Sequence, residues 1–132
     1  MAEPASDLVK QWVQKAEEDW EAAQLLVRHQ TQAAATCFHC QQCAEKLLKA
    51  ALLAAGHAIP KVHDLSLLSS LLSERDPHWT WDSDALEDLT AGAVASRYPG
   101  YAIDSHDASE SILQAGELRL ALLRRLGLDP NK

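Results

Sequence analysis

The sequence predicts an all-α fold, a helical bundle in a single domain spanning residues 1–132. The length of 132 residues suits one domain with one core. The composition is rich in Ala and Leu and only 5% aromatic, which favours helices over strands. Apolar residues recur at helical spacing in five segments, and no alternating run is long enough for a sheet.

The first helix is expected to start at Ser6 or Asp7, either of which can cap it. Asp19 lies near the edge of its apolar stripe, one turn after Lys15. It is either an ordinary boundary carboxylate paired with Lys15 or a partly buried one. The stripe itself consists of Val9, Trp12, Val13, Ala16, Trp20, Ala23 and Val27.

The second helix, about Ala33 to Ala55, is the longest and most apolar, and Gly56 suits the left-handed residue that follows it. Small residues on one broad face allow another helix to approach closely. A charged stripe on the opposite side of so central a helix needs solvent, a partner subunit or a ligand. That side carries Phe38, Gln42, Glu45, Lys46 and Lys49.

A short third helix should begin at Asp64 or Ser66, after a connection containing Pro60, and end before Asp76-Pro77. Its core-facing edge is leucine-rich. Trp79 and Trp81 follow in the next connection, where we expect both to be exposed as interaction surfaces, as we do Leu25 on the first helix.

The fourth helix should start at Asp82 or Ser83 and finish near Arg97, because Pro99 disfavours helix at Tyr98. Its acidic residues are expected to cap and solubilise it: Asp82, Asp84, Glu87 and Asp88. Its apolar residues are Ala85, Leu86, Leu89, Ala93 and Val94.

The last helix should open at Asp104 or Ser105 and close at Gly127, followed by Pro130. Its apolar residues recur at helical spacing: Ala108, Ile112, Ala115, Leu118, Leu122 and Leu126.

Charge and hydropathy exclude several functions. Twelve Lys and Arg against 19 Asp and Glu give a net charge of −7, which argues against broad coating of a phosphate backbone but leaves room for a small basic pocket. No apolar run reaches the roughly 18–20 residues that span a bilayer, and the segment Met1 to Asp7 shows no signal sequence. We expect a cytoplasmic protein without membrane contact.

Cys37, Cys40 and Cys43 resemble a metal-binding run but are expected to be reduced packing residues. Successive cysteines on a helix rotate by about 60° and cannot converge on one tetrahedral ion, and His39 faces away from the first two. The chain has no glycine-rich phosphate loop and no recognisable Ser-His-Asp spacing. We therefore expect no metal and no cofactor.

Arg97 is the leading candidate for ligand binding, because a guanidinium beside a proline-fixed loop presents a fork of donors to phosphate. The alternative is an ordinary pair with an acidic neighbour. Tyr98 and Tyr101 can stack on a base or pack the loop. The lysines Lys46, Lys49 and Lys61 are weaker phosphate candidates, or plain solvated side chains.

Two histidines are candidates for phosphate binding or proton transfer. His63 lies just before a helix start, where exposed backbone donors favour an anion; otherwise it caps and orders the Pro60 loop. His106 lies in the first turn of the last helix and is a weaker candidate for an acid or base.

Four stretches together resemble the HEPN-domain family of small helical proteins. These are residues 12–26 with Asp19, the run from Cys40 to Ala50, His63-Asp64-Leu65 with its Pro60 loop, and Arg97-Tyr98-Pro99. The resemblance implies an antiparallel bundle of four main helices plus a short one, usually paired as a homodimer. It also implies a nucleotide or RNA ligand, and small prokaryotic members are often encoded beside a minimal nucleotidyltransferase.

Many ribonuclease members of that family use an Arg followed after four to six residues by a His at the subunit interface. The resemblance implies that the His transfers protons and the Arg stabilises phosphate charge. Here eight residues separate Arg97 from His106, with Pro99-Gly100 between them, so the chain departs from that pattern.

Three functional hypotheses follow. The first is a non-enzymatic protein that binds a nucleotide or RNA end through Arg97, with His63, Lys46 or Lys49 assisting and Asp19 orienting one of these groups, and that works with a separate nucleotidyltransferase in a toxin–antitoxin-like pair. The second is a metal-independent ribonuclease toxin that uses Arg97 with His106 or His63. The third is a helical interaction scaffold without a ligand.

Overall fold

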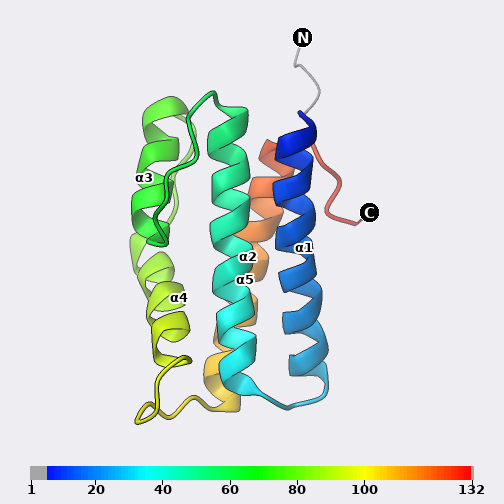
Figure 1. Ribbon diagram of the computed structural model, residues 1–132, viewed down its shortest axis with the longest axis vertical. Helices are drawn as coiled ribbons and strands as arrows, with labels where there is room; N and C mark the ends of the chain where they lie inside the picture. Colours follow the sequence, from blue (N-terminus) through cyan, green and yellow to red (C-terminus); the bar gives the residue numbers. More distant parts are fainter. Residues whose placement is uncertain (1–5, 132) are drawn as a thin grey trace.

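The computed structural model describes residues 6–131. Within that range the regular secondary structure is entirely α-helical, as predicted. The helices are α1 (Asp7–Arg28), α2 (Ala33–Ala54), α3 (Leu65–Arg75), α4 (Ser83–Ala95) and α5 (Ser105–Arg125). They form a bundle with α2 at its centre and α1 on one side. The short helices α3 and α4 follow one another along the other side, and α5 lies behind α2 (Figure 1). Helix α2 packs against all four other helices.

The helix ends follow from local side-chain chemistry. The Ser6 side chain accepts a hydrogen bond from the Val9 N–H, and an aspartate caps each of α3, α4 and α5: Asp64, Asp82 and Asp104. Gly56 and Gly127 follow α2 and α5 with φ of 84° and 75°, a conformation that glycine adopts without strain. These starts and stops confirm the sequence prediction. Helix α4 ends two residues earlier than expected, at Ala95, so Arg97 lies in the turn that follows.

The core forms around the small residues of α2. Cys37, Cys40 and Cys43 are at most 1% exposed, and burial, with a smaller contribution from Cys37, raises the pKa of the Cys40 thiol to about 12. The prediction that these cysteines pack as small apolar residues is confirmed. In the described part of the chain, no group of three or more His, Cys, Asp or Glu side chains is arranged to hold a metal ion.

Two predictions about exposure were wrong. Trp79 is only 8% exposed, because its indole Nε1 donates to the Ser69 hydroxyl at 3.0 Å and its ring stacks on the half-buried Trp81. The connection after α3 therefore folds back onto the bundle. Val94 was placed on the apolar stripe of α4 but is 47% exposed, since Leu86, Leu89 and Ala93 face the core. Leu25 is exposed, as expected.

Helices α1 and α5 are joined by Arg119. Its guanidinium donates twice to the Glu17 carboxylate, each at 2.7 Å, and once to the Pro130 carbonyl at 3.0 Å. It also lies over the Trp20 ring, 5.4 Å from the centroid. Gly116 lets the Trp20 ring pack against α5, because a Cβ at residue 116 would lie only 3.1 Å from that ring. One side chain thus ties the C-terminal segment to the first helix.

Within residues 6–131, none of the helices combines the length and the apolar character needed to cross a membrane.

Candidate functional site

The outer face of α2, as we name the side carrying Phe38, Gln42, Glu45, Lys46 and Lys49, is the candidate site. Sequence reasoning expected this charged stripe to require solvent, a partner subunit or a ligand. That expectation was wrong for two of its members: Glu45 and Lys49 are 4% and 6% exposed, and their charges balance each other inside the chain. Two carboxylates, one on α1 and one on α2, organise the face into two clusters.

The Asp19 cluster joins α1 to α2. Asp19 is 8% exposed. Its Oδ1 lies 2.8 Å from His39 Nδ1, and its Oδ2 accepts from Lys46 Nζ at 2.6 Å. Lys15 pairs instead with Glu18, at 3.5 Å on the surface, so the predicted Lys15–Asp19 pair is wrong. Asp19 is the partly buried carboxylate of the other alternative, and it orients both a cation and an imidazole.

The Glu45 cluster joins α2 to the loop before α3. Glu45 Oε2 accepts from Lys49 Nζ at 3.0 Å, and Glu45 Oε1 accepts from Gln41 Nε2 at 3.1 Å. The Nδ1 of His63 lies 3.1 Å from both carboxylate oxygens. Burial raises the pKa of Glu45, but the hydrogen bonds from Lys49, Gln41 and His63 outweigh it and hold the pKa below its usual value. Glu45 therefore stays ionised.

Lys49 is not the solvated side chain that the sequence indicated. Its ammonium lies against Glu45 and over the Trp12 ring, 5.9 Å from the centroid. A buried ammonium requires such a partner, because an unpaired charge away from water is costly. Lys46 is half-buried, and Lys61 is exposed.

Arg97 reaches the outer face of α2 from the turn after α4. Its guanidinium carbon lies 5.5 Å from the Phe38 ring centroid, and its Nε donates to the Ala93 carbonyl at 3.4 Å. The Phe38 ring meets the His39 ring edge-on, with centroids 5.6 Å apart. Among residues 6–131, no carboxylate forms an ion pair with Arg97, so the predicted acidic neighbour is not found. Arg97 is exposed beside the Asp19 cluster.

The structure separates the two predicted histidines. The His63 side chain is 78% exposed and contacts Glu45; Asp64 caps α3, so the capping alternative for His63 is wrong. His106 is exposed and, with Asp88 and Glu110, lines a cavity. Arg97 is not among the residues that line that cavity. Tyr98 and Tyr101 are 58% and 62% exposed.

His39 is the functional candidate that sequence reasoning missed. A signal for it exists in the hairpin formed by α1 and α2. Their connection is short and centred near residues 30–31, so antiparallel packing places Asp19 opposite residue 42, midway between His39 and Lys46. Both of those side chains therefore meet Asp19 from α2.

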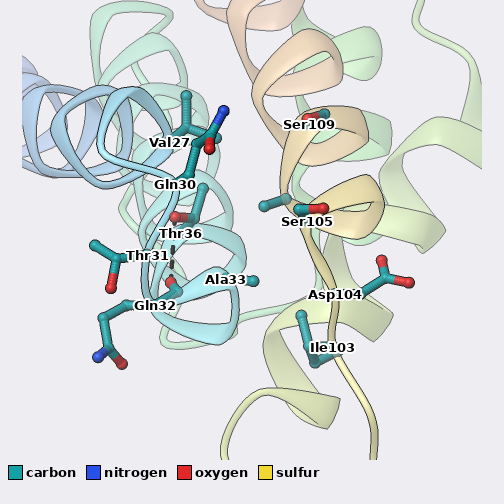
Figure 2. A pocket seen from close by; sticks show the side chains of 11 residues that line it. Val27, Gln30, Thr31, Gln32, Ala33, Thr36, Ile103, Asp104, Ser105 and Ser109 are labelled. Atoms are coloured by element: carbon teal, nitrogen blue, oxygen red, sulfur yellow. Dashed lines mark hydrogen bonds between the residues drawn. The ribbon is translucent and has the colours of Figure 1, made fainter.

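A cavity of about 600 Å³ opens at the other end of α1, between the α1–α2 connection and the start of α5 (Figure 2). Two of its polar side chains already have partners: the Thr36 hydroxyl donates to the Gln32 carbonyl, and the Asp104 carboxylate caps α5. Gln30 and Gln32 hold φ of 52° and 53° there, which shapes a tight turn. None of the predicted site residues lines this cavity.

Comparison with known proteins places the chain among helical domains of one type. The family model described as "HEPN domain" matches residues 9–126. Two solved structures are similar. TT1696 from Thermus thermophilus has a TM-score of 0.75 and 22% identity, and the match covers 92% of this chain and 99% of that one. ST0689, described as an archaeal HEPN homologue, has a TM-score of 0.67 and 25% identity, and the match covers 89% of this chain and 97% of that one. No curated protein matches the sequence.

Proposed function

Because the chain belongs to the HEPN domain family, we propose that it binds a nucleotide or the end of an RNA at the outer face of α2. In this proposal it acts as a homodimer and works with a separately encoded minimal nucleotidyltransferase in a toxin–antitoxin-like pair. The observation that carries the proposal is Arg97, an exposed guanidinium that rests on the Phe38 ring and has no carboxylate partner among residues 6–131.

A phosphate suits this position because the guanidinium offers a planar fork of donors. The contact with Phe38 orients the guanidinium before the ligand arrives, so less side-chain freedom is lost on binding. Tyr98 is exposed next to Arg97 in the same turn and provides an aromatic surface for a base.

The two clusters supply the rest of the proposed site. Asp19 holds Lys46 and His39 in place, and Glu45 holds Lys49 and His63. Their carboxylates offset most of the positive charge, which supports weak and local recognition rather than binding along a duplex. Arg97 is therefore the main phosphate contact, with Lys46 and His63 assisting.

The binding test uses a single-stranded tetraadenylate RNA with a 5′-phosphate, titrated into the wild type and into Arg97→Ala. We expect the variant to bind about tenfold or more weakly and to show a reduced salt dependence. The matched control is Arg124→Ala, an exposed arginine at the far end of α5, which should bind as the wild type does. Equal affinity of wild type and Arg97→Ala contradicts the proposed phosphate contact.

The partnership is tested separately, by co-expression with a minimal nucleotidyltransferase encoded beside the gene and size-exclusion chromatography of the mixture. A co-eluting complex supports it. Separate elution at micromolar concentrations removes the partnership from the proposal and leaves ligand binding to stand alone.

RNA cleavage is a second candidate function, favoured by the Asp19–His39 pair. Asp19 fixes Nδ1 of a 31% exposed imidazole, which leaves Nε2 to take the proton from a ribose 2′-hydroxyl as its oxygen attacks the adjacent phosphorus. The P–O5′ bond then breaks as the 5′-oxygen takes a proton from the His39 imidazolium, which returns the imidazole to its neutral form, and Arg97 stabilises the phosphate charge.

The cleavage test incubates a mixed RNA pool without added metal. We expect cleavage to be lost in folded His39→Gln and Arg97→Ala and kept in His106→Gln. Loss in His106→Gln with activity in His39→Gln restores the assignment predicted from the sequence, and no cleavage by the wild type leaves binding as the function.

A further inference from the structure

A cavity of about 600 Å³ lies between the first half of α1 and the outer face of α2. Its size falls within the roughly 300–1,000 Å³ of small-molecule sites. The walls are mainly apolar with a basic rim, formed by Leu8, Gln11, Trp12, Gln14, Lys15 and Lys46. Lys46 belongs to the outer face of α2, whereas Arg97 does not line this cavity. The cavity is therefore a second candidate binding site on that face.

Trp12 forms an aromatic wall of the cavity and is held in place from within. The ammonium of Lys49 lies over its ring at 5.9 Å, and the Lys49 side chain is only 7% exposed, so this contact comes from the protein interior. Lys49 is fixed in turn by Glu45. A fixed indole in an open, apolar cavity is a platform on which a nucleic-acid base stacks.

Two ammonium groups lie at the rim of the cavity. Within residues 6–131, Lys15 pairs only with Glu18, at 3.5 Å on the surface, and such a surface pair is weak. Lys46 donates to Asp19 at 2.6 Å and keeps two further N–H donors. Both groups can therefore donate to one anion beside the Trp12 ring.

The cavity and Arg97 lie at different levels of α2. Arg97 contacts Phe38, whereas Trp12 contacts Lys49. These two α2 residues are eleven positions apart, or about 16 Å along the helix axis at 1.5 Å per residue. A single nucleotide does not span that distance, but a short unpaired strand does.

We propose that the Trp12 cavity binds a base of an unpaired RNA strand whose other end is held at Arg97. The base stacks on Trp12, and the phosphate of that nucleotide lies between Lys15 and Lys46. This inference rests on the proposed function, because it assigns a second contact to the same RNA. It makes the Trp12 cavity the place where the chain distinguishes a strand from a mononucleotide.

The experiment compares two probes by calorimetric titration: a 5′-phosphorylated tetraadenylate RNA and a tetramer of the same backbone without bases. The variants are Trp12→Leu, which keeps apolar bulk but loses the aromatic plane, and Trp12→Phe, which keeps a ring. We expect Trp12→Leu to bind the adenylate strand roughly tenfold more weakly and Trp12→Phe to recover most of the affinity. Neither change should alter binding of the strand without bases.

Leu25→Ala is the matched control, an exposed leucine of α1 outside the cavity, and circular dichroism checks that each variant remains helical. If Trp12→Leu binds the adenylate strand as tightly as the wild type does, the inference is overturned. If Arg97→Ala still binds that strand more weakly, the proposed function stands without it. Equal losses for both probes assign Trp12 a structural role and also overturn it. If the wild type binds neither probe up to about 1 mM, the weak end of useful affinity, both proposals fall.

Discussion

The Asp19 and Glu45 clusters on the outer face of α2 share three side-chain types and differ in exposure. Each contains one carboxylate, one lysine and one histidine bound through Nδ1. In the Asp19 cluster, the Lys46 and His39 side chains are 25% and 31% exposed. In the Glu45 cluster, Lys49 is 7% exposed and His63 is 78% exposed.

The difference shows which lysine–carboxylate pair is shielded from water and which remains open to it. The Glu45–Lys49 pair is shielded from water, so removing one partner strands a buried charge. The partners of Asp19 keep contact with solvent and can be rehydrated or bound by a ligand. The same three side-chain types thus bury the lysine of the Glu45 cluster and leave both partners of Asp19 in contact with solvent.

The largest effect is expected from Glu45→Leu, which leaves the Lys49 ammonium buried without its carboxylate. The free energy of unfolding should fall by about 3–5 kcal/mol, measured by urea denaturation. The control is Glu45→Leu combined with Lys49→Met, which removes both charges and should regain most of the loss. A double variant no more stable than the single one contradicts the view that the stranded charge is the cause.

A smaller effect is expected from Asp19→Asn. The amide keeps an acceptor but loses the negative charge, and both partners can turn to water, so the loss in the free energy of unfolding should be about 1–2 kcal/mol. Urea denaturation measures it beside Glu87→Gln, an exposed carboxylate of α4 that should change stability little. A loss as large as that of Glu45→Leu would show that partner exposure does not set the difference.

The smallest effect is expected from acid. The folded-state pKa of Glu45 lies below the ordinary value of 4.5, so its ionised form stabilises the fold fully above that pH. This contribution is lost as the pH falls from 4.5 through the lowered folded-state pKa. The stability advantage of the wild type over Glu45→Gln should therefore be constant just above pH 4.5 and shrink below it. A stability advantage of the wild type over Glu45→Gln that grows as the pH falls below 4.5 contradicts this prediction.

The helices could be predicted from the sequence because their limits are local. Asp64, Asp82 and Asp104 each bond to backbone N–H groups within three residues, and Gly56 needs no distant partner to adopt a positive φ. Apolar spacing then placed most core residues correctly. Such features depend only on neighbours along the chain.

The site was predictable only in part, because its contacts cross between helices. Arg97 and Asp19 were recognised as candidates, but the partner of Asp19 depends on how α1 lies against α2. The burial of Lys49 was missed since helical spacing assigns a charged residue to the solvent side, whatever covers it. Trp79 was missed because its partner, Ser69, lies on the preceding helix rather than in the loop.

The bond between Arg119 and Glu17 has a kinetic consequence. The two residues are 102 positions apart in a chain of 132, so this contact closes most of the polypeptide into a loop. Such closure has an entropic cost that falls once the intervening helices are packed. We therefore expect it to form late in folding. Interactions absent from the transition state slow unfolding without speeding folding, so we expect Arg119 to lengthen the lifetime of the native bundle.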